Sequence, residues 1–309
     1  CSSDLLAGLR DPHGFRPLVL GKLGGSWILA SETSALDVVG AEYVREVEPG
    51  ELVVITPHGL ESRRPFGSGH RISQCVFELI YFARPNSNIF GESVYAFRKL
   101  LGKTLARECP VEADIVIPVP DSGTISALGF SKETGIPFGM GLIRSHYIGR
   151  TFIEPTQRIR DFGARIKFSP VRGILEGKRV VMVDDSLVRG TTSRKIVKMV
   201  REAGAREIHL RISAPPTRHP CYYGIDFPDP GELIANRMST EEIARYLGAD
   251  SLGYVSIEGM YAAMSLDDTS ERYCAACFDG RYPVVPVDSK LPATAAGKAP
   301  AAGEQSLPF

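Results

Sequence analysis

A series of short, almost wholly apolar runs that alternate with helical segments after about residue 70 most constrains the fold. Two of these runs predict buried strands, at Asp114–Pro118 and Arg179–Val183, and further strands are predicted at Glu207–Ser213 and near Leu142–Ile143. Helical periodicity marks Ser93–Glu108, the stretch after Gly123, and Thr191–Ala203. Because strands this apolar are buried on both faces, the pattern predicts a parallel α/β sheet with helices on both faces.

The first 65 or so residues have a different character. Strand-like runs at Val19–Gly21, Ser26–Ala30 and Glu51–Ile55 are separated by glycine and proline, and Arg63–Gly69 is predicted to be a connector. Near the other end, Ser239–Glu242 has the capping-box pattern and predicts a helix that runs to about Leu247. After Pro286 the composition turns to Ala, Pro, Gly and Lys, which predicts a disordered tail.

Charge and hydropathy exclude several classes of protein. Lys and Arg together number 36, as do Asp and Glu, so the overall charge gives no reason to expect a nucleic-acid or anionic-membrane partner. No apolar run is long enough to predict a membrane span, and the first residues lack the basic and apolar segments of a signal peptide. A cytoplasmic location is the resulting expectation.

The segment Val180–Thr192 carries the most specific chemical signal. An apolar strand ends in Asp184 and Asp185, and a short loop with Gly190 then opens a helix at Thr191 and Thr192. In open α/β sheets ligands bind at the carboxyl ends of the strands, and free N–H groups at a helix start favour a phosphate. Gly190 allows the main chain to approach that phosphate closely.

Two carboxylates beside a phosphate site need an explanation, because they repel an anion. Ribose hydroxyls and a bridging Mg²⁺ supply one, since carboxylates accept hydrogen bonds from a diol and hold the metal. The glycine–lysine phosphate loop of many nucleotide-binding proteins is absent. The alternative is a strand that ends in a solvated acidic turn, which explains the aspartates but not the whole segment.

Val180–Thr192 resembles the phosphoribosyl pyrophosphate (PRPP) signature of type I phosphoribosyltransferases. Five further segments, in family order, resemble the glutamine PRPP amidotransferases: Arg10–Leu18, Ser31–Leu36, Cys75–Pro85, Pro118–Gly123 and Tyr147–Phe152. The resemblance implies a type I phosphoribosyltransferase sheet at 69–284. It also implies that a β-rich remnant of an N-terminal-nucleophile glutaminase domain forms 1–68, with a tail at 285–309.

The resemblance also implies an activity, in which PRPP, glutamine and water give 5-phosphoribosylamine, glutamate and pyrophosphate at the start of purine biosynthesis. In this family Ser122, Asp184 and Asp185 would bind Mg²⁺, and Arg150, Lys167 and Tyr95 would act in catalysis. PRPP would be bound by Asp184, Asp185, Ser186, Leu187, Val188, Arg189, Gly190, Thr191 and Thr192. From the residues alone, the cations around Arg150 and Lys167 could equally form a solvated loop surface, and Tyr95 could be a core residue.

Four of the six cysteines resemble the ligands of the [4Fe-4S] cluster in the iron–sulfur branch of the family. These are Cys75, Cys221, Cys274 and Cys277, of which the last two form a Cys-x-x-Cys pair. The spacing alone also permits a four-cysteine zinc site or unligated thiols. Cys109 has no visible partner in the sequence and is expected to be a small buried residue.

Cys1 does not fit the catalytic N-terminal cysteine of the glutaminase, because no glycine and apolar stretch follow it and Arg10 lies only a few residues away. We therefore expect a chain truncated within that domain, with exposed apolar faces and at best the use of free ammonia. The family further implies homo-oligomers and inhibition by purine nucleotides. Two alternatives remain: a nucleobase phosphoribosyltransferase, and a PRPP-binding regulator of nucleic acid that catalyses nothing.

Overall fold

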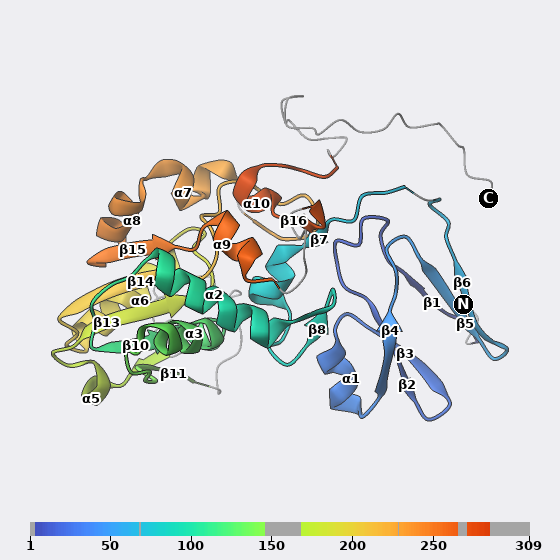
Figure 1. The fold of residues 1–309 in the computed structure, drawn as a ribbon, viewed down its shortest axis with the longest axis horizontal. Helices are drawn as coiled ribbons and strands as arrows, with labels where there is room; N and C mark the ends of the chain where they lie inside the picture. Colours follow the sequence, from blue (N-terminus) through green and yellow to red (C-terminus); the bar gives the residue numbers. More distant parts are fainter. Residues whose placement is uncertain (1–3, 68, 146–167, 228, 265–270, 285–309) are drawn as a thin grey trace, which may run out of the picture.

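The computed structural model describes residues 4–67, 69–145, 168–227, 229–264 and 271–284. Small antiparallel sheets form the first part of the chain, and an α/β layer structure forms the rest (Figure 1). No helix in the described ranges is long and apolar enough to cross a membrane.

The central sheet has four parallel strands in the order β10-β13-β14-β15. They are β10 (Ile115–Pro118), β13 (Arg179–Asp184), β14 (Glu207–Ile212) and β15 (Ser251–Tyr254). The first three confirm the predicted strands. β15 was not predicted, because Ser-Leu-Gly-Tyr is neither wholly apolar nor alternating. The predicted strand near Leu142 exists as β11 (Leu142–Arg144), but it pairs antiparallel with β12 (Phe168–Pro170) outside the main sheet.

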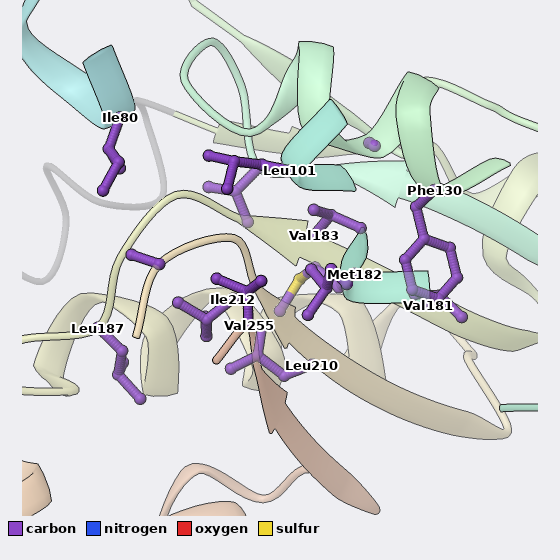
Figure 2. Close-up of a cluster of buried hydrophobic side chains, with 14 of the residues drawn as sticks. Ile80, Leu101, Phe130, Val181, Met182, Val183, Leu187, Leu210, Ile212 and Val255 are labelled. Carbon is purple, nitrogen blue, oxygen red and sulfur yellow. The ribbon is translucent and has the colours of Figure 1, made fainter. Parts of the chain in front are cut away.

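Helices cover both faces of this sheet, as predicted. α2 (Val94–Glu108) and α3 (Thr124–Thr134) lie on one face, and α6 (Thr191–Glu202) lies on the other (Figure 2). α8 (Thr240–Leu247) packs beside α6 and begins with the predicted capping box at Ser239. Apolar side chains from the strands and from the helices fill the core, among them Val181, Met182 and Leu210 of the strands and Phe130 of α3 (Figure 2).

Two three-stranded antiparallel sheets make up the first part of the chain. One has the order β1-β5-β6 and the other β3-β2-β4. Their strands are β1 (Leu6–Leu9), β5 (Leu52–Thr56), β6 (Gly59–Arg63), β3 (Ser26–Ala30), β2 (Val19–Leu23) and β4 (Glu42–Glu46). The predicted connector at Arg63–Gly69 is wrong at its first residue, which ends β6.

Large apolar side chains are exposed across this first part, as expected. They include Leu5, Leu6, Leu9, Leu23, Val38, Val39, Tyr43, Val44 and Phe66. Its own small core is formed by Leu20, Val47, Val53 and Ile55. The exposed residues outnumber these buried ones, so this part of the chain covers little of its own apolar surface.

Shorter elements connect the two parts and complete the fold. They are α1 (Thr33–Val39), β7 (Gln74–Cys75), the π-helical turn η1 (Glu78–Phe82), β8 (Asn88–Ile89), β9 (Glu92–Ser93), α5 (Arg172–Leu175), η3 (Pro230–Glu232), α7 (Ile234–Arg237), α9 (Ile257–Ala262), β16 (Tyr273–Cys274) and α10 (Ala276–Asp279). The β7–β16 pair joins segments that are distant in the sequence, and it lies where the two parts meet (Figure 1).

Candidate functional site

The two predicted aspartates lie at the carboxyl end of the central strand β13. Asp184 is 9% exposed and Asp185 is 6% exposed, and the Asp185 N–H donates to Asp184 Oδ1 at 2.9 Å. Burial, followed by the neighbouring charge of Asp185, raises the pKa of Asp184 well above its ordinary value. These are buried carboxylates, so the structure does not support the solvated acidic turn.

Ser122, the third predicted magnesium ligand, lies beside this pair. Burial raises the pKa of Asp185, while hydrogen bonds from the Ser122 and Ser186 side chains oppose that rise. The Ser186 hydroxyl donates to Asp185 Oδ1 at 2.5 Å. Carboxylate and hydroxyl oxygens are hard donors of the kind that Mg²⁺ prefers, so the residues present fit this ion.

A close main-chain contact fixes Ser122 against the strand. The Val119 N–H donates to Val183 O at 2.8 Å, which holds the segment between β10 and α3 against the end of β13. A Cβ added at Gly123 would lie 2.3 Å from Val183 O and 3.0 Å from Val119 O. Only glycine allows this approach, so Gly123 sets the distance between Ser122 and the aspartates.

Gly123→Ala is therefore expected to destabilise the protein by about 2–3 kcal/mol, because main-chain atoms must move to admit the methyl group. The unfolding midpoint in urea measures the loss. Gly173→Ala is the matched control, since a Cβ at Gly173 meets nothing within 4 Å. Equal midpoints for the two variants would contradict the assigned role of Gly123.

The predicted phosphate loop lies at the same end of the sheet and leads into α6. Gly190 has a φ of 75°, in the left-handed region, and immediately precedes the first turn of the helix. Thr191 and Thr192 are exposed on that turn. The loop therefore presents main-chain N–H groups and two hydroxyls beside the acidic pair, which is the chemistry of a phosphate site.

Three predicted loop residues use their side chains for the fold. Leu187 is buried in the core (Figure 2), and Val188 is half-buried while its carbonyl accepts from the Ile234 N–H at 2.9 Å. Arg189 forms an ion pair with Glu232 at 2.7 Å. For Leu187 and Val188, only the main chain is placed to contact a ligand.

The predicted catalytic residues have different outcomes. Tyr95 lies in the first turn of α2 and is 42% exposed, with the Lys99 ammonium 5.8 Å from its ring centroid, so it is not a core residue. Arg150 and Lys167 lie outside the described residues. Their assignment stays a prediction.

Sequence reasoning missed Arg98, which is only 3% exposed on α2. Its Nε donates to Leu79 O at 2.8 Å and its Nη2 to Ala83 O at 2.7 Å. A signal was present: Arg98 interrupts the apolar stripe of the helix, one turn after Val94 and one turn before Leu101.

The four predicted ligand cysteines come together where the two parts of the chain meet. Cys75 in β7 is in register with Cys274 in β16, and Cys277 follows in α10. Burial, then the charges of Cys75, Cys274 and Cys221, raises the pKa of Cys277 well above its ordinary value. Burial raises the pKa of Cys75 to about 12. The other three thiols therefore lie near enough to Cys277 for their charges to affect its ionisation.

A [4Fe-4S] cluster and a structural zinc ion both take four thiolate ligands. All four cysteines are free, and the described residues contain no group of three His, Cys, Asp or Glu side chains placed to hold a single metal ion. Four thiols are the donor set that either group requires, so the residues present fit a cluster.

Cys109 is not one of these four cysteines. Its Sγ donates to Tyr254 O at 3.4 Å, and the residue is half-buried. Cys109 is a free cysteine packed against the core, although it is half-buried and not fully buried as expected.

The parallel sheet covered on both faces defines a phosphoribosyltransferase-like fold, and the acidic pair and the glycine loop lie where a ligand site is expected in it. The chain is 54% identical over 291 residues to amidophosphoribosyltransferase 1, chloroplastic, of Arabidopsis thaliana, covering 94% of this chain and 51% of that protein. It is 52% identical over 287 residues to amidophosphoribosyltransferase of Mycobacterium tuberculosis, covering 90% and 53%. The chain belongs to the amidophosphoribosyltransferase family.

A solved structure agrees with this assignment. Glutamine PRPP amidotransferase from B. subtilis, complexed with ADP and GMP, superposes with a TM-score of 0.85 at 51% identity, covering 95% of this chain and 65% of that one. No family model matches the sequence. The chain spans about half the length of the curated relatives it matches.

Proposed function

We propose that this chain binds PRPP with Mg²⁺ and transfers its phosphoribosyl group to ammonia, releasing pyrophosphate and 5-phosphoribosylamine. The observation that carries the proposal is the buried Asp184–Asp185 pair beside the Gly190 loop, at the carboxyl end of β13. Carboxylates next to a phosphate cradle suit a sugar phosphate that carries a diol and a metal, and PRPP has both features.

Each part of the site has a role in this reaction. The N–H groups and hydroxyls from Ser186 to Thr192 bind the 5-phosphate, while Asp184 and Asp185 accept hydrogen bonds from the ribose hydroxyls. Asp184, Asp185 and Ser122 would hold Mg²⁺, which would supply positive charge to the departing pyrophosphate when bound. Arg150 and Lys167 are proposed to add to that charge. Substitution at C1 passes through an oxocarbenium-like state, so the site positions ammonia and needs no covalent nucleophile.

The nitrogen donor is proposed to be ammonia, because the described site residues are assigned to the sugar phosphate and its metal and none of them to glutamine hydrolysis. Tyr95, exposed on the first turn of α2, is proposed to line the path by which ammonia reaches C1.

Pyrophosphate release from PRPP and Mg²⁺ tests the proposal. Release should require an ammonium salt at a pH where part of it is free ammonia, and glutamine should not replace it. Release that instead requires a purine base would favour a nucleobase phosphoribosyltransferase. PRPP binding without release under any of these conditions would favour a non-catalytic regulator.

We also propose that Cys75, Cys221, Cys274 and Cys277 hold a [4Fe-4S] cluster with a structural or oxygen-sensing role. The reaction requires no electron transfer, so a redox role in catalysis is not implied. The cysteines join β7, β16 and α10, and the Cys75 N–H donates to Phe15 O at 3.0 Å, so a cluster there would tie the end of the chain to the junction of its two parts.

Purine nucleotides are proposed as inhibitors of this chain. The B. subtilis relative is complexed with ADP and GMP. A nucleotide 5′-phosphate has the same chemistry as the 5-phosphate of PRPP, so the Gly190 loop can accept either. GMP at millimolar concentration is expected to raise the apparent Kd for PRPP several-fold, and guanosine, which lacks the phosphate, is the control. An equal effect of guanosine would exclude competition at this loop.

A homo-oligomeric state, the domain boundaries and a cytoplasmic location stay predictions.

A further inference from the structure

Arg98 is a buried cation with no role in the reaction proposed above. Its guanidinium donates to the carbonyls of Leu79 and Ala83, which lie within and just after the π-helical turn η1. A π-helical turn has a looser hydrogen-bond pattern than an α-helix and is frequent at functional sites. Arg98 therefore ties this turn to α2.

Close packing fixes α2, and with it Arg98, relative to the acidic site. A Cβ at Gly102 would lie 1.9 Å from Ser126 O, and one at Gly129 would lie 2.1 Å from Lys99 O. The Ser126 hydroxyl also donates to Arg98 O at 3.1 Å. α3, which carries Ser126, begins two residues after Ser122, so Arg98 and the loop of Ser122 are held by one helix pair.

The positive charge of Arg98 interacts with two carboxylates, those of Asp185 and Glu32. Burial lowers the pKa of Arg98 to about 10, and the charges of Asp185 and Glu32 oppose that shift. The group therefore stays protonated at neutral pH. Glu32 belongs to the first part of the chain, where its Oε2 accepts from the Arg84 N–H and the Ser87 hydroxyl, each at 2.7 Å.

We propose that Arg98 is a positioning residue of the phosphoribosyl site, an inference that rests on the proposed function. Its guanidinium holds the Leu79–Ala83 turn against α2 and supplies a fixed positive charge that acts on Asp185. Two adjacent buried carboxylates repel each other, and a fixed cation offsets that repulsion so that the pair keeps the geometry that Mg²⁺ and the ribose require.

Arg211 provides a matched control for the loss of a buried arginine. It is 4% exposed, and its Nε and Nη1 donate to Cys109 O at 2.9 Å and Leu210 O at 3.0 Å. Burial lowers its pKa, and no carboxylate contributes to that shift. Both arginines are buried, but only the charge of Arg98 interacts with a carboxylate of the proposed site.

The test compares Arg98→Gln, Arg98→Lys and Arg211→Gln with wild type, by calorimetric titration of PRPP over a range of Mg²⁺ concentrations. Arg98→Gln keeps a donor but loses the charge, and is expected to bind PRPP about tenfold more weakly and to require more Mg²⁺. Arg98→Lys keeps the charge and is expected to stay within about threefold of wild type, as is Arg211→Gln.

The outcomes separate this inference from the proposed function. If wild type shows no PRPP binding, the proposed function fails. If wild type binds and Arg98→Gln binds as tightly as Arg211→Gln, the role of Arg98 is overturned. If Arg98→Gln does not fold, folded Arg98→Lys decides the question, because a tenfold loss in a variant that retains the charge would refute the electrostatic argument.

Discussion

Replacing Asp184 and Asp185 together by asparagine is expected to lower ammonia-dependent pyrophosphate release at least about 100-fold. The amides keep the size of the side chains but remove the charge that holds Mg²⁺ and accepts the ribose hydroxyls. The fold should survive, because burial raises the pKa of both carboxyl groups, so a neutral side chain costs little there. Pyrophosphate release at saturating PRPP measures the effect.

Asp114→Asn is the matched control for this variant. Asp114 precedes β10 at the opposite end of the sheet, where it pairs with Arg179 at 3.0 Å. Its replacement removes one carboxylate far from the proposed site and should leave the rate within about twofold of wild type. Unchanged activity in the double asparagine variant at positions 184 and 185 would contradict the site assignment.

Cys277→Ser is expected to abolish the brown colour of protein purified without oxygen, together with its iron and acid-labile sulfide. Cys277 is buried, and its carbonyl accepts from the N–H groups of Arg218 and His219. Since the proposed cluster would tie β16 and α10 to β7, its loss should also lower the thermal unfolding midpoint by several degrees. Visible absorption, iron and sulfide assays and a melting curve provide the measurements.

Cys109→Ser is the control, because the Cys109 thiol donates to the carbonyl of Tyr254 at the end of β15 and is not one of the four proposed ligands. It should keep the full iron and sulfide content. Colourless wild-type protein from anaerobic purification would refute the cluster, and bound zinc in its place would support the single-ion alternative.

The sequence predicted the elements whose signals are local. β10 and β13 are nearly continuous apolar runs, β14 alternates apolar and polar residues, and the helix Val94–Glu108 repeats its apolar residues at helical spacing. The capping box at Ser239 contains both of its partners within four residues. Each of these elements carries enough information in its own residues to be found without the rest of the chain.

Elements that depend on tertiary pairing were missed or misplaced. β15 contains a glycine and only one large aliphatic residue, and it is a strand because it pairs with β14 at the edge of the sheet. β11 was correct as a strand, but no local pattern shows that its partner is β12 rather than the central sheet. The residues of one strand do not show which distant strand it pairs with.

The candidate site was predicted unevenly for the same reason. Asp184, Asp185 and the loop to Thr192 are contiguous, so their proximity follows from the chain, and Ser122 joins them because β10 and β13 are parallel neighbours. Arg98 was missed because its partners, Leu79 and Ala83, come from a π-helical turn that the sequence did not reveal. The cysteines were grouped by family resemblance, and the β7–β16 pairing supplies the physical reason.

The most direct test of the account is calorimetric titration of the folded wild-type chain with PRPP in the presence of Mg²⁺. We predict saturable heat at one site per chain that disappears when Mg²⁺ is chelated and in the double asparagine variant at positions 184 and 185. Absence of any binding heat from well-folded protein, or equal binding by that variant, would contradict the assignment of this loop as a PRPP site.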